Sequence, residues 1–80
     1  MKIYWHEGRK NIIGDNVRVI RRKARLTQQQ LAIKIQLLGY EFDRITVSRI
    51  ELGDRFVADY EVKALAQGLG VDIQALYGRL

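Results

Sequence analysis

Residues 27–55 read TQQQLAIKIQLLGYEFDRITVSRIELGDR, and this stretch decides the fold. Thr27 is followed three residues later by Gln30, which is the spacing of a capping box, and this predicts a helix over residues 28–38. Gly39 is expected to end that helix, because glycine readily adopts the left-handed backbone of a helix terminus. The apolar residues at helical spacing, which are expected to be buried, are Leu31, Ala32, Ile35 and Leu38.

A second helix is predicted over residues 44–52 of the same stretch. Asp43 is a favoured type of residue at a helix start, and Gly53 follows the last turn. The inner face of this helix carries Val47, Ile50 and the aliphatic part of Glu51. An isoleucine beside an arginine is unusual on a face that meets only water, so the outer face is a candidate contact surface. That outer face carries Ile45, Ser48, Arg49 and Leu52.

Upstream of this stretch, a helix is predicted from about residue 11 or 12 to residue 25. One face repeats apolar residues at spacings of four, three and four, and these are Ile13, Val17, Ile20 and Ala24. The opposite face is basic, with Arg18, Arg22 and Arg25, and Arg21 lies at the border of the buried face.

Two further helices are predicted downstream. Asp59 is the expected cap of a helix over 60–68, and Asp72 is the expected cap of a short helix over 73–77. The buried set of the first is Val62, Leu65, Ala66 and Leu69. The sequence therefore predicts one all-α domain over residues 11–80, preceded by an arm or short strand at residues 1–10. Three roles remain open for that segment, namely a minor-groove arm, a dimer element or a disordered tail.

Composition and charge narrow the class of protein. The 80 residues are 48% hydrophobic and 29% charged, which is typical of one small globular domain. No cysteine is present, so disulfides and zinc–thiolate sites are excluded. Residues 1–25 hold eight basic and two acidic side chains, a net charge of +6, so one part of the surface is expected to bind an anionic partner.

An enzyme is not expected. The single histidine, His6, has no serine nearby in the sequence, and the carboxylates at 41/43 and 59/61 are spaced so that they diverge on a helix. Gly68-Leu-Gly70 lacks the third glycine and the preceding strand of a phosphate-binding loop, so it is interpreted as a helix end. No cofactor, metal, membrane or small-molecule substrate is expected, and the localisation expected by default is the cytoplasm of a bacterial or phage-type system.

The motifs on these helices resemble the Cro and lambda-repressor type of helix-turn-helix domain, which is found in XRE-like regulators. The residues that carry the resemblance are Thr27-Gln28, Leu31-Ala32, Val47-Ser48-Arg49-Ile50-Glu51 with Gly53, and Leu65-Ala66 with Leu69-Gly70-Val71 and Leu76. The resemblance covers about residues 11–78 and implies a five-helix all-α fold that binds double-stranded DNA. Relative to the common form, residues 35–43 contain extra residues, which implies an extended second helix and a broader turn.

The resemblance also implies which residues meet DNA. The helix over 44–52 would lie in the major groove and read bases through Arg44, Ile45, Thr46, Ser48 and Arg49. Phosphate contacts are expected from Thr27, Gln28, Arg18, Arg22 and Arg55. A partly buried ion pair between Arg21 and Glu51 is expected to connect the first helix to the reading helix.

A homodimer on a palindromic operator is the expected assembly of such a regulator or repressor. The apolar residues left over for the dimer contact are Ile73, Leu76, Tyr77 and Leu80, although Leu76 is equally suited to the core of one chain. The alternative function is a protein-interaction module, such as an antitoxin or accessory subunit with the same fold, and exposed Ile45 and Leu52 favour it. The steep salt dependence of DNA binding distinguishes the two.

Overall fold

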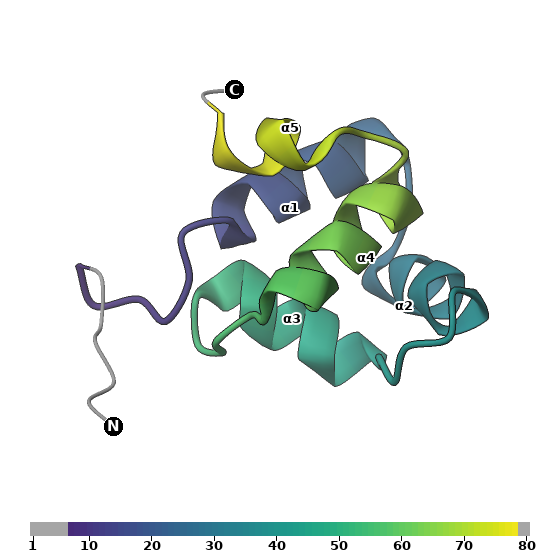
Figure 1. Cartoon of the computed structure of the whole chain (residues 1–80), viewed down its shortest axis with the longest axis horizontal. Helices are drawn as coiled ribbons and strands as arrows, with labels where there is room; N and C mark the ends of the chain where they lie inside the picture. Colours follow the sequence, from purple (N-terminus) through teal and green to yellow (C-terminus); the bar gives the residue numbers. More distant parts are fainter. Residues whose placement is uncertain (1–6, 79–80) are drawn as a thin grey trace.

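The structure is a computed structural model that describes residues 7–78, and within that range five helices follow one another without a long connection (Figure 1). The predicted all-α, five-helix architecture is confirmed. The helices are α1 (Gly14–Lys23), α2 (Gln28–Leu37), α3 (Arg44–Leu52), α4 (Asp59–Leu69) and α5 (Ile73–Tyr77). The segment Lys2–Trp5, together with His6 and Leu80, lies outside the described residues.

The described helices surround one apolar core, and α4 contributes five of its buried residues. Helices α2 and α3 pack against each other, α1 packs on α3, and α5 closes the far side against α1 and α4. The buried apolar residues are Ile13, Val17, Ile20, Leu31, Ala32, Ile35, Phe42, Val47, Ile50, Val62, Ala64, Leu65, Ala66, Leu69 and Leu76.

Two residues predicted to be buried are exposed instead. Ala24 follows the last residue of α1, where the chain turns outward, and Leu38 follows the last residue of α2 and is 45% exposed. Both lie where the helical periodicity that predicted their burial has ended. The prediction failed because it extended each helix by one or two residues.

The ends of α2 and α3 are those that the capping residues predict. Thr27 Oγ1 accepts a hydrogen bond from the Gln30 amide at 3.0 Å, and Gln30 Oε1 accepts from the Thr27 amide at 2.8 Å. Asp43 Oδ1 accepts from the amide of Thr46 at 2.7 Å, which lowers the pKa of Asp43 below its ordinary value. These hydrogen bonds satisfy amides that have no partner inside the helix.

Helix α4 begins one residue earlier than predicted. Asp59 lies inside the helix rather than at its cap, and Ala58 occupies the cap position. The carboxylate of Glu61 accepts from the amide of Ala58 at 3.0 Å, so it does the capping from three residues downstream. The prediction placed the cap on the aspartate and overlooked this acceptor. At α5, Asp72 occupies the cap position as predicted, without a side-chain hydrogen bond to the helix.

The extra residues of this chain form a broad turn over 38–43, between α2 and α3. Phe42 is buried there, and its carbonyl accepts a hydrogen bond from Gln36 Nε2. Tyr40 stacks on Tyr60 of α4 with ring centroids 6.4 Å apart. These contacts hold the turn on both sides, and so they fix where α3 begins.

Candidate nucleic-acid interface

The outward face of α3 is open to solvent. Its inner residues, Val47, Ile50 and Glu51, are buried against the core, so the remaining side chains must point away from it. Arg44, Ile45 and Arg49 are exposed, and Ile45 has 58% of its surface accessible. The predicted base-reading residues thus share one surface, with Ser48 and Thr46 half-buried at its edges.

A buried ion pair holds α3 against α1. Arg21 Nε lies 2.6 Å from Glu51 Oε2, and Arg21 Nη2 donates to Glu51 Oε1 at 3.0 Å. The hydrogen bond to Glu51 raises the pKa of Arg21, against the opposing effect of burial. A third bond, from Arg21 Nη1 to the carbonyl of Leu26 at 2.8 Å, also ties the connection between α1 and α2 to this pair.

The beginning of α2 joins the same network. Gln28 Nε2 donates to Glu51 Oε1 at 3.1 Å, so one carboxylate connects residues of all three helices. Beside it lies a hollow of about 220 Å³ between α1, α2 and α3, whose lining includes Arg18, Arg22 and Gln28. The structure therefore brings three of the predicted phosphate-binding residues together next to the outward face of α3.

The basic residues of this surface differ in the hydrogen bonds and ion pairs that they form within the chain. Arg18 Nη2 donates to the carbonyl of Glu51 at 3.1 Å and lies 3.7 Å from Asp15. Arg49 lies 3.6 Å from Asp54. Among the described residues, neither Arg22 nor Arg44 has an ion pair or a side-chain hydrogen bond, so their guanidinium groups are available to an external anion.

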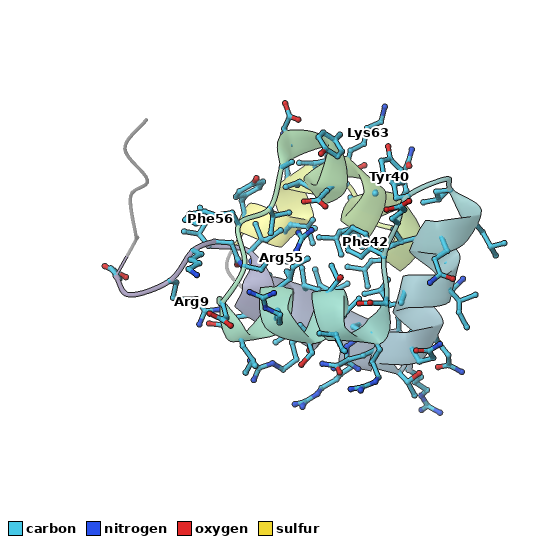
Figure 2. The ribbon with its side chains drawn as sticks, turned by 90° about the horizontal axis from the view of Figure 1, so that it is seen from below. Arg9, Tyr40, Phe42, Arg55, Phe56 and Lys63 are labelled. Atoms are coloured by element: carbon cyan, nitrogen blue, oxygen red, sulfur yellow. The ribbon has the colours of Figure 1, made fainter. Side chains whose placement is uncertain are left out.

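Arg55, which is expected to reach the DNA backbone, forms an ion pair within the chain. Its two terminal nitrogens donate to the two carboxylate oxygens of Glu61, both at 3.0 Å, and its guanidinium lies 5.9 Å from the ring centroid of Phe42. Figure 2 shows Arg55 and Phe42, which lies in the broad turn, adjacent to each other beside α3. Both terminal nitrogens of Arg55 thus contact an internal carboxylate, and a contact between Arg55 and the DNA backbone stays a prediction.

The ion pair between Arg55 and Glu61 shifts the pKa of both residues. Burial by itself would raise the pKa of Glu61, but the hydrogen bonds from Arg55 and from the Ala58 amide outweigh it and lower that pKa. The hydrogen bond to Glu61 in turn raises the pKa of Arg55. The carboxylate is thus held in its charged form, which is the form that caps α4.

Sequence reasoning missed the N-terminal strap, residues 9–11, which crosses the end of α3 (Figure 1). The amide of Lys10 donates to the carbonyl of Gly53 at 2.8 Å, and Asn11 Nδ2 donates to the carbonyls of Ile50 at 3.1 Å and Arg55 at 2.8 Å. The strap therefore adds hydrogen bonds to carbonyls of the last turn of α3 and of the segment that follows it. No local pattern could predict these contacts, because their partners lie about 40 residues away.

Arg9 completes the strap by packing on the glycine that ends α3. Its Nη2 reaches the carbonyl of Glu51 at 3.4 Å, and Figure 2 shows it beside the end of that helix. Gly53 has φ of 77°, and a Cβ there would lie 2.7 Å from the Arg9 guanidinium carbon. The left-handed backbone conformation thus favours glycine at this position, and any larger residue would also displace the Arg9 guanidinium group.

The predicted dimer residues separate into two groups. Ile73 and Tyr77 of α5 are 43% and 52% exposed. Leu76 has no exposed surface, because it points between α5, α1 and α4 into the core of its own chain. Its assignment to a dimer contact was therefore wrong. In the described part of the chain, no helix is long and apolar enough to cross a membrane.

Comparisons with known proteins show which family model and which solved structures the chain is similar to. A family model described as a helix-turn-helix domain matches residues 12–77. The restriction-modification controller protein C.AhdI from Aeromonas hydrophila is similar in structure, with a TM-score of 0.72 and 28% identity over 80% of this chain and 86% of that chain. The DNA-binding domain of BldD is also similar, with a TM-score of 0.70 and 26% identity over 95% of this chain and 97% of that chain. No curated protein sequence matches the chain.

Proposed function

This chain belongs to the helix-turn-helix domain family, of the Cro and lambda-repressor type, and from that premise we propose that it is a transcriptional regulator that binds a palindromic operator as a homodimer. Domains of this family bind double-stranded DNA and are not enzymes. As a regulator of this kind it would act in the cytoplasm, with residues 11–80 as the DNA-binding domain.

The observation that carries the proposal is the outward face of α3. Arg44 and Arg49 have the planar fork that fits the O6 and N7 acceptors of guanine, and Ile45 offers apolar contact to a thymine methyl. Thr46 and Ser48, at the edges of the same face, are short enough to bond to base edges close to the helix. Because the Arg21–Glu51 pair holds α3 firmly, this face would enter the groove without reorganising.

Phosphate contacts come from the neighbouring hollow. Thr27 and Gln28 lie at the start of α2, where free amides and the helix dipole favour an anion. Arg18 and Arg22 lie beside them on α1 and supply formal charge. The hollow is thus suited to a phosphate next to the groove that α3 occupies.

The proposed dimer contact uses the exposed apolar side chains of α5, Ile73 and Tyr77. One helix-turn-helix unit reads only a few base pairs, whereas a genome presents about 10⁶–10⁹ competing sites. Two-fold symmetry with half-sites about one helical turn apart multiplies the number of bases read.

The test is selection of bound duplexes from a random DNA pool, followed by binding measurements in a salt series. The expected result is an enriched inverted repeat with guanine in each half-site. On it, log K should fall linearly with log salt, with a slope of about −0.9 per phosphate neutralised. A pool without any enriched sequence would contradict the proposal.

A second function is favoured by two exposed apolar residues on α3. Ile45 is 58% and Leu52 is 65% exposed, and apolar surface on a reading helix also suits contact with a protein. In a protein-interaction module, binding of the target would depend on Ile45 and Leu52 and would change little with salt. The same salt series therefore separates the two functions.

A further inference from the structure

Asp54, the residue after the glycine that ends α3, forms a closed arrangement with Arg49. The amide of Asp54 donates to the carbonyl of Arg49 at 2.9 Å, and Arg49 Nη2 donates back to the carbonyl of Asp54 at 3.2 Å. The carboxylate of Asp54 lies 3.6 Å from Arg49 Nε. Two of these contacts therefore hold the Arg49 side chain, half of whose surface is exposed, against the residue that follows the end of α3.

These contacts engage one edge of the guanidinium group. An arginine has five N–H donors in a fixed fork, and Asp54 faces the Nε and one donor of Nη2. Both donors of Nη1 and the second donor of Nη2 remain, and these point along the axis of the side chain. That pair of nitrogens can donate to two acceptors side by side, as guanine O6 and N7 require.

The carboxylate itself is held from the other side by the N-terminal strap. Asp54 Oδ1 lies 3.9 Å from Lys10 Nζ, and the amide of Lys10 is bonded to the carbonyl of Gly53. Asp54 keeps 59% of its side chain exposed, so its charge also faces whatever approaches the end of α3. One carboxylate is thus placed both to orient Arg49 and to repel phosphate.

We propose that Asp54 is a specificity-determining positioning residue, which holds Arg49 for end-on contact with a base and lowers the affinity for DNA of any sequence. The inference rests on the proposed reading of a base by Arg49. It adds that Asp54 increases discrimination by ordering Arg49, which favours only the correct duplex, whereas its negative charge weakens phosphate binding on every duplex alike.

The test compares Asp54→Asn with Asp72→Asn, a matched control that removes the same charge at the start of α5, which packs on α1 and α4. Dissociation constants are measured on the selected duplex and on a scrambled one. The specificity ratio is the dissociation constant on the scrambled duplex divided by that on the selected duplex. Asp54→Asn should bind scrambled DNA about two- to five-fold more tightly, the range for loss of one surface charge interaction. Its specificity ratio should fall by about two- to ten-fold, the range for immobilising one long side chain. In the Asp72→Asn control the ratio should stay unchanged.

The same measurement is then repeated in an Arg49→Ala background. There Asp54→Asn should no longer change the specificity ratio, because no side chain remains to be positioned. A melting temperature equal to that of the parent establishes that each variant is folded. An Asp54→Asn variant that keeps the parental ratio overturns the inference, and so does an Arg49→Ala variant that keeps it. A parent protein without any sequence preference overturns the proposed function instead, so the two failures are distinguishable.

Discussion

Replacing Arg21 by alanine should destabilise the domain severely. Glu51 is 2% exposed, and the substitution removes two of the hydrogen bonds that its carboxylate accepts, at 2.6 and 3.0 Å, while Gln28 remains at 3.1 Å. Removing one partner of a buried pair costs about 3–5 kcal/mol. A domain of 80 residues has a free energy of unfolding of about 4–12 kcal/mol, so the loss is a large part of the total.

Urea and thermal unfolding followed by circular dichroism measure this loss. At about 4–8 °C per kcal/mol for a domain of this size, the melting temperature should fall by at least about 12 °C. Arg22→Ala is the matched control on the exposed side of α1, and it should change stability by less than about 0.5 kcal/mol.

A double variant separates the cost of an unpaired charge from the value of the pair. Arg21→Met combined with Glu51→Leu replaces both partners by apolar side chains, and it should recover most of the lost stability. If Arg21→Ala unfolds at the same temperature as Arg22→Ala, the pair does not hold α3 and the reasoning is refuted.

Four further results are expected. Arg49→Ala should lose about 1–3 kcal/mol on the selected duplex in equilibrium binding, whereas equal loss on a scrambled duplex would mean that Arg49 grips phosphate. Arg22→Ala should weaken binding to all duplexes alike and reduce the salt slope by about one, and an unchanged slope would remove it from the phosphate contacts. The pKa of Glu61 is lowered from its ordinary value of 4.5 in the folded protein. The charged carboxylate therefore contributes to the free energy of unfolding above pH 4.5, and this contribution is lost as the pH falls through the pKa of the folded protein. Urea unfolding between about pH 5 and 3 should therefore show a steeper loss in the parent than in Glu61→Gln, and parallel curves would contradict the pair. Tyr77→Asp should bind a duplex with a single half-site as tightly as the parent does, but should lose the higher affinity that the parent has for a duplex with two half-sites. Gel shift measures both affinities, and sedimentation is the control for the oligomeric state.

Local patterns predicted the elements whose ends depend on nearby residues. Asp43 and Gly53 set both ends of α3, and Thr27 with Gln30 set the start of α2, because each contact lies within four residues in the sequence. The outward face of α3 followed from helical spacing alone.

What the sequence could not predict depends on side-chain contacts that join one element of the fold to another. Arg55 was predicted to contact the DNA backbone because it follows α3, and its ion pair with Glu61 of the next helix was not foreseen. The strap at residues 9–11 caps α3 from about 40 residues away, and no periodicity encodes such a contact. The orientation of Arg49 likewise depends on Asp54, beyond the helix that carries it.

The strap also determines where a mechanical load on the chain would act first. Lys10 and Asn11 bond directly to the carbonyls of Gly53, Ile50 and Arg55, so tension applied at the amino end reaches the last turn of α3 before it reaches the core. A tether or fused domain placed there would pull on the reading helix itself. The opposite end of the chain leaves from α5, which packs on α1 and α4, and it is the better point of attachment for surface immobilisation.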